Sequence, residues 1–119
     1  MFRTITAFLS GLVLAACSGG SDGAKEALAA VEAGAVLIDV RSAEEYAGGH
    51  LPASLNIPHP QIVAGVADLA VDKSTPIVLY CRSGNRSGIA TKSLEDAGYS
   101  NVMNAGAYGA LQIEWNGAL

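Results

Sequence analysis

The chain has 119 residues, half of which are hydrophobic, and a formal net charge of −4. This length holds one hydrophobic core and is too short for two ordinary domains. The acidic balance is the opposite of the basic face with which a protein neutralises nucleic-acid phosphates, so we expect no nucleic-acid partner.

The N-terminal segment has the features of an export signal. Arg3 precedes the apolar stretch "ITAFLSGLVLAA", which is too short to span a bilayer. The "LAAC" that ends at Cys17 is similar to a bacterial lipobox, in which the cysteine is lipidated and becomes the new N-terminus. We therefore predict a signal peptide at residues 1–16, followed at residues 17–23 by a lipidated Cys17 and a flexible tether. The alternative is an ordinary signal peptide that is cut near Ala16.

From residue 24 onward, apolar stretches with a helical period alternate with apolar runs of strand length. Unbroken runs such as "PIVLYC" are typical of a parallel sheet that is covered on both faces. We predict an α/β domain at residues 24–119, with a small parallel sheet of four or five strands flanked by helices on both faces. The predicted elements are, in chain order, a helix at 24–34, a strand at 35–40, a helix at 42–49, a strand at 53–58, a helix at 60–70, a strand at 76–81, a helix at 87–99, a strand at 101–105 and a helix at 108–115.

Several residues mark the ends of these helices. Gly34 and Gly98 follow helical patterns and can end them in a left-handed conformation. The hydroxyl of Ser42 can cap the helix that it opens, and the two glutamates in the first turn of that helix suit its positive end. We expect Ser87 to cap the helix that follows the third strand.

The two cysteines have different predicted fates. If Cys17 carries a lipid, the protein is anchored to a bacterial membrane and faces the periplasm or the cell exterior. Cys81 is then the free thiol of the mature chain and has no partner for an internal disulfide. An exported protein keeps an unpaired thiol either buried or available for a reaction.

The segment "YCRSGNRSG" places Cys81 at the carboxyl end of a strand, where α/β sheets bind their ligands. The turn and the start of the next helix can point backbone N–H groups at the sulfur and so form an anion nest. Gly84 permits the backbone conformation that closes such a turn, and Arg82 and Arg86 add positive charge. These features predict a lowered thiol pKa and a reactive cysteine. The alternative is that Cys81 is a small buried hydrophobic residue.

Two motifs resemble those of a known family. "CRSGNRS" matches the C-x-x-G-x-R-[ST] active-site loop of single-domain rhodaneses, the thiosulfate sulfurtransferase family. "LIDVRSAEEYAGGHLPASLNIP" is similar to the early signature of the same family. The resemblance implies a ping-pong reaction in which Cys81 takes a sulfane sulfur from thiosulfate or a similar donor as a persulfide. The sulfur then passes to cyanide or to a thiol.

The resemblance also suggests roles for the neighbouring residues. Within the loop, the anionic donor would be bound by Arg82, Ser83, Gly84, Asn85, Arg86 and Ser87. An ion pair among Asp39, Arg41 and Glu45 would hold the end of a strand and the following helix together, and a direct substrate role for Arg41 stays open. We expect no cofactor or metal, because neither histidine has ligand spacing with another metal-binding side chain.

Two other functions remain as alternatives. The domain could store or carry sulfane sulfur, or dock a partner protein, without turning over. Cysteine phosphatases have a similar loop, but their arginine follows the cysteine by six residues, whereas Arg86 follows Cys81 by five. The shorter loop favours a single sulfur atom over a phosphoryl group. The chain also departs from the family pattern where Ala107 follows Gly106, a place usually held by paired glycines, and where the "PAS" of residues 52–54 lacks a glycine often found there.

Overall fold

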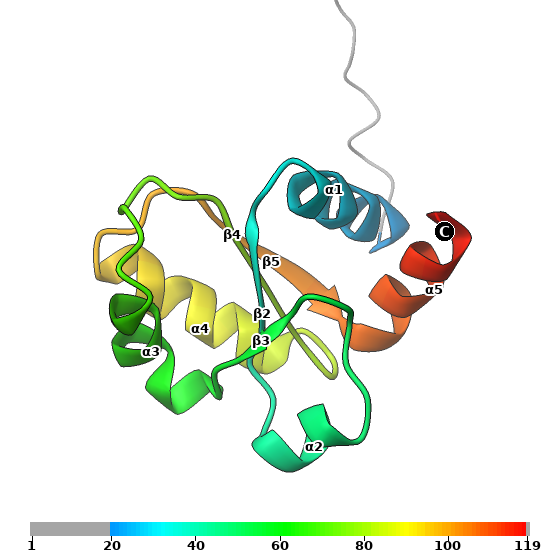
Figure 1. Ribbon diagram of the computed structural model, residues 1–119, viewed down its shortest axis with the longest axis horizontal. Coiled ribbons are helices and arrows are strands. Elements are labelled where there is room, and N and C mark those ends of the chain that lie inside the picture. The colour runs from blue at the N-terminus through cyan, green and yellow to red at the C-terminus, as the bar shows by residue number, and fades with distance from the viewer. Residues whose placement is uncertain (1–19, 119) are drawn as a thin grey trace, which may run out of the picture.

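Four parallel strands form the centre of the computed structural model, which describes residues 20–118 (Figure 1). Their order across the sheet is β3-β2-β4-β5, so the strand that carries Cys81 lies between two others. This arrangement confirms the predicted α/β fold with its small parallel sheet. The strands are β2 (Val36–Asp39), β3 (Leu55–Asn56), β4 (Ile77–Cys81) and β5 (Val102–Ala107).

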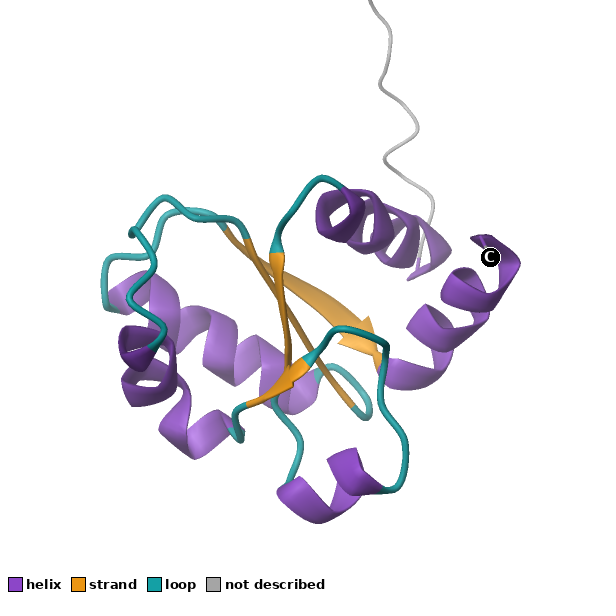
Figure 2. Cartoon of the chain, in the orientation of Figure 1, coloured by secondary structure: helices purple, strands orange, loops and turns teal. Residues whose placement is uncertain are grey.

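Helices cover both faces of the sheet, as predicted (Figure 2). On one face, α1 (Gly20–Glu32) packs against α5 (Tyr108–Ala118) and β5. On the other face, α3 (Ile62–Asp68) packs against α4 (Asn85–Asp96). The connection between β2 and β3 contains the short helix α2 (Ala43–Ala47), and a 3₁₀ turn, η3 (His59–Gln61), leads into α3.

Strand β4 is buried at every position because helices cover both of its faces. Ile77, Leu79 and Cys81 contribute to the hydrophobic cluster shared with α3 and α4. Val78 and Tyr80 contribute to the cluster shared with α1 and α5. Since side chains alternate along a strand, the final residue of β4 presents its sulfur to the face that α4 covers.

The structure differs from the sequence predictions at two helix starts. Helix α1 begins at Gly20 rather than at Ala24, so residues 20–23 of the predicted tether are helical. Helix α4 begins at Asn85, with Gly84 at φ 100° as its N-cap, so Ser87 lies in the first turn and does not cap. Left-handed glycine can lead directly into a helix without a side-chain cap.

The predicted lipidation residue, Cys17, lies outside the described residues. Among residues 20–118, no helix combines the length and the apolar character that crossing a membrane requires. The second predicted strand is shorter than expected, because only Leu55–Asn56 pairs with β2 and Ala53 has a positive φ of 68°.

Close packing between α3 and the chain after β3 gives a test of the fold. A Cβ at Gly65 would lie 2.5 Å from Cγ2 of Ile57, whereas one at Gly109 in α5 would meet no atom within 4 Å. Gly65→Ala should therefore lower the free energy of unfolding by about 1–3 kcal/mol through overpacking. Gly109→Ala, the control, should be neutral or stabilise by up to about 1 kcal/mol. Urea denaturation measures both, and equal stability of the two variants would contradict this packing.

Candidate active site

The site is built around the sulfur of Cys81, at the carboxyl end of β4. The residue is 0% exposed and belongs to the cluster that β4 shares with α3 and α4. Only three residues, 82–84, separate the end of β4 from the start of α4. The helix N-terminus therefore lies directly beside the sulfur, where its free N–H groups favour a negative charge.

The short loop turns hydrogen-bond donors toward this buried sulfur. The N–H of Gly84 donates to Sγ at 3.0 Å, and the hydroxyl of Ser87 lies 3.5 Å from it. Burial, the largest single influence, raises the pKa of Cys81, but the hydroxyl of Ser87 and the N–H groups of Ser87, Gly84 and Ser83 lower it and prevail. The sulfur is therefore both enclosed and prepared to carry a negative charge.

The hydroxyl of Ser87 is shared among several acceptors. Its Oγ lies 2.7 Å from Oδ1 of Asn104 and 3.2 Å from the carbonyl oxygen of Gly84. A hydroxyl has one hydrogen to donate, and both of these contacts are shorter than the contact with sulfur. The N–H of Gly84, at 3.0 Å, therefore makes the shorter of these two hydrogen bonds to the sulfur of Cys81.

Asn104 in β5 supports the loop from the neighbouring strand. Its Nδ2 donates to the carbonyl oxygen of Gly84 at 3.3 Å, and its Oδ1 accepts from the N–H of Gly106 at 3.0 Å. This residue was not predicted from the sequence. Its position near the carboxyl end of β5, the strand beside β4, could have indicated a role in the site. Polar residues at that edge of a parallel sheet lie close to the loops that leave neighbouring strands.

Two glycines meet where β5 passes the loop. Gly84 has φ 100° and Gly106 has φ 92°, both in the left-handed region that favours glycine. A Cβ at Gly84 would lie 3.4 Å from Cα of Gly106. Ala107, which replaces the second glycine of the family pattern, ends β5 in register with Cys81.

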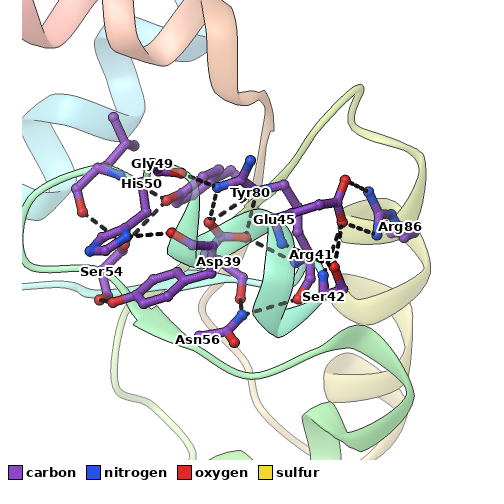
Figure 3. A network of polar contacts seen from close by, with 12 residues as sticks. Asp39, Arg41, Ser42, Glu45, Gly49, His50, Ser54, Asn56, Tyr80 and Arg86 are labelled. Carbon is purple, nitrogen blue, oxygen red and sulfur yellow. Dashed lines mark hydrogen bonds and ion pairs between the residues drawn. The ribbon is translucent and has the colours of Figure 1, made fainter.

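The two arginines predicted to bind the anionic donor, Arg82 and Arg86, differ in exposure and in partners. Arg86, in the first turn of α4, donates through Nη1 and Nη2 to the carboxylate of Glu45 in α2, at 2.8 Å and 3.0 Å (Figure 3). Arg82, Ser83 and Asn85 are exposed. That both arginines bind the donor stays a prediction, and in this structure the Arg86 guanidinium is paired with an internal carboxylate, Glu45.

A buried ion pair joins the last residue of β2 to the loop that leads into α2. Arg41 donates through Nη2 to Oδ2 of Asp39 at 2.6 Å and to the carbonyl oxygen of Gly49 at 2.7 Å (Figure 3). Its guanidinium also lies over the ring of Tyr108, 4.5 Å from the centroid. Of the three predicted partners, Asp39 and Arg41 do pair, and both precede α2. Glu45, the expected partner within α2, pairs with Arg86 instead.

Other features near the site have structural explanations. His50 stacks on the ring of Tyr46 with centroids 3.6 Å apart and contacts the carbonyl oxygen of Tyr46. Within residues 20–118, no three histidine, cysteine or acidic side chains gather where they could hold a metal ion. An open hollow of about 460 Å³ lies along the outer face of α4 and is lined by Gly84, Asn85, Gly88, Ile89, Lys92 and Ser93. Cys81 is not among its lining residues, but Gly84, whose N–H donates to the sulfur, is.

The role of the Gly84 amide can be tested with two matched glycine variants. Gly84 and Gly98 have nearly the same φ, 100° and 102°, so alanine at either should cost about 1–2 kcal/mol of backbone strain. Only Gly84→Ala displaces a donor from Cys81. We expect it alone to slow alkylation of Cys81 at neutral pH, by up to about tenfold, the effect of one pKa unit. Iodoacetamide kinetics measure this, and equal rates in the two variants would contradict the cradle.

Comparison with known proteins identifies the family. The family model described as "Rhodanese-like domain" matches residues 23–108. Thiosulfate sulfurtransferase PspE of Escherichia coli is 38% identical over 69 residues, which cover 58% of this chain and 66% of that protein. Thiosulfate sulfurtransferase GlpE of Pseudomonas savastanoi pv. phaseolicola is 37% identical over 80 residues, which cover 67% of this chain and 74% of that protein.

Solved structures with a similar fold support the same family. A solved structure of the human single-domain sulfurtransferase TSTD1 has a TM-score of 0.63 and 32% identity, and the match covers 76% of this chain and 91% of that chain. The chain spans just under two thirds of the length of the Escherichia coli relative. The resemblance carried by the two sequence motifs is confirmed at the level of the family. The chain belongs to the rhodanese-like domain family, and the relatives described above are sulfurtransferases.

Proposed function

We propose that the protein is a sulfurtransferase that takes a sulfane sulfur from thiosulfate or a similar small anion and passes it to cyanide or to a thiol. The observation that carries this proposal is the N–H of Gly84, 3.0 Å from the sulfur of Cys81 at the start of α4. Support also comes from relatives that are named thiosulfate sulfurtransferases. Cys81 is the catalytic nucleophile in this proposal.

The first half-reaction begins with the thiolate of Cys81, which attacks the outer sulfur of the donor. A new S–S bond forms to Cys81, the S–S bond of the donor breaks, and sulfite leaves with the bonding electron pair. The persulfide carries its negative charge on the terminal sulfur, and the loop N–H groups stabilise that charge as they stabilise the thiolate. A thiolate or cyanide then attacks the terminal sulfur and regenerates Cys81.

The chemistry requires no general base at the loop. The lowered pKa of Cys81 supplies the thiolate, and neither leaving group needs a proton. Arg82, the exposed arginine next to the nucleophile, is the side chain that we assign to attract the donor. The positive end of α4 provides the remaining attraction.

A sulfur-carrier function is the second candidate, and the complete burial of Cys81 favours it. An enclosed sulfur is shielded from bulky acceptors, so a stored persulfide would survive until a suitable partner opened the loop. The carrier and the enzyme share the loading step. They differ in how fast the sulfur leaves.

Loading and turnover can be measured separately. Incubation with thiosulfate should add the mass of one sulfur atom to the protein, and cyanide should then release thiocyanate catalytically. Cys81→Ser should abolish both results, whereas Cys17→Ala, which removes the other cysteine, should leave transfer unchanged. Loading without turnover would favour the carrier. Transfer retained by Cys81→Ser, or no loading in the unaltered protein, would contradict both functions.

We further propose that the protein works as a lipoprotein at a bacterial membrane, in the periplasm or on the cell surface. The support is the sequence "LAAC" that ends at Cys17, preceded by Arg3 and a short apolar stretch. A protein produced in a bacterial host should carry a lipid mass on the N-terminal cysteine and partition into the detergent phase. Cys17→Ala should lose both properties. An unlipidated mature protein that begins near residue 17 would show an ordinary signal peptide instead.

A further inference from the structure

The Arg86 side chain, expected to bind the anionic donor, already has an anion. Nη1 lies 2.8 Å from Oε1 of Glu45 and Nη2 lies 3.0 Å from Oε2, so the two planar groups meet in a bidentate pair. Both side chains are partly exposed, at 30% and 27%, which places the pair at the rim of the site rather than in the core.

This pair lies within electrostatic reach of the reacting sulfur. The pKa of Arg86 is raised chiefly by its hydrogen bonds to Glu45, and a negative charge on Cys81 raises it further. Glu45 remains ionised, because hydrogen bonds from Arg86 and from the backbone N–H of Ser42 lower its pKa to about 2. The rim of the site therefore holds one positive and one negative charge, with a net charge of zero.

The other two arginines within residues 20–118 differ in whether a carboxylate pairs with them. Arg41 is paired with the buried carboxylate of Asp39. Arg82 forms no ion pair with any residue between 20 and 118. An incoming donor thus meets one uncompensated guanidinium and the positive end of α4, not two free arginines.

We propose that Glu45 is a specificity-determining residue, which neutralises Arg86 and so adapts the site to singly charged sulfane donors over dianionic thiosulfate. This inference rests on the proposed sulfurtransferase function. A dianion that uses Arg86 must displace Glu45 or lie beside it. In either case its second negative charge meets the carboxylate, whereas a monoanion is held by Arg82 and the loop N–H groups alone.

Two donors that differ by one negative charge test whether Glu45 sets the preference for a singly charged donor. Thiosulfate is a dianion, and methanethiosulfonate is the monoanion in which a methyl group replaces one of its oxygens. The thiolate of Cys81 attacks the outer sulfur of either donor, and the electron pair leaves with sulfite or with methanesulfinate. Charge and atoms balance in both reactions, and cyanide serves as the common acceptor.

Glu45→Gln removes the charge and keeps the shape. Glutamine can still accept from the N–H of Ser42, so the capping box that begins α2 is retained. We expect the ratio of kcat/KM for thiosulfate to kcat/KM for methanethiosulfonate to rise about tenfold, equivalent to about 1.4 kcal/mol. Glu44→Gln, the control, makes the same charge change at an exposed position of α2 that is not bonded to Arg86, and should change the ratio by less than about twofold.

A charge series completes the test. Arg86→Gln leaves Glu45 uncompensated and should lower the ratio, and the double variant Glu45→Gln/Arg86→Gln should restore it. A purely structural pair would instead reduce activity with both donors alike, and that result would overturn the inference. An unchanged ratio across the series would overturn it too, while sulfur transfer itself remained intact. No transfer from either donor in the unaltered protein would refute the proposed function and this inference with it.

Discussion

The site depends on the contact between the N–H of Gly84 and the sulfur of Cys81, because that contact opposes the cost of burying a charge. A thiolate that is removed from water without partners is unfavourable, and its pKa rises. Here the sulfur is fully buried, yet its pKa is lowered, because donors from a single short turn and a helix start converge on it. Burial and charge stabilisation are provided by the same few residues.

The rest of the fold holds that turn in place. Strand β4 is buried on both faces, which fixes the position of Cys81 at the end of the strand and the face of the sheet toward which its side chain points. Helix α4 packs on the same face, so its N-terminus cannot move away from the sulfur without loss of core contacts. Strand β5 supports the turn from the side through Asn104 and Gly106. The parallel sheet is thus the reason why three loop residues are enough to build the site.

Two ion pairs, one buried and one partly exposed, neutralise charges near the site. The pair of Asp39 and Arg41 is buried and holds the segment of Gly49 against the sheet. The pair of Glu45 and Arg86 lies at the rim and joins α2 to α4. A buried pair that loses one partner leaves a costly charge behind, whereas a rim pair can exchange its partner for a bound ion. This difference is why the rim pair, and not the buried one, can respond to the charge of a substrate.

Local sequence signals predicted the parts of the site that are local in the chain. The apolar runs predicted the sheet, and the placement of Cys81 and Gly84 at the end of one run predicted the turn. The cap was predicted at Ser87, but Gly84 begins the helix, because a left-handed glycine and a serine three residues later both fit the same pattern. Asn104 and the partner of Arg86 were missed, since those contacts join residues 17 to 41 positions apart and depend on how the elements pack.

The turn lowers the energy of a negative charge on the sulfur of Cys81, and a pH titration of the thiolate by ultraviolet absorbance, with Cys81→Ser as the blank, measures this stabilisation. We expect a midpoint clearly below the value of about 8.5 for an unperturbed cysteine. A midpoint at or above that value would show that burial outweighs the N–H donors and that the turn does not stabilise the thiolate.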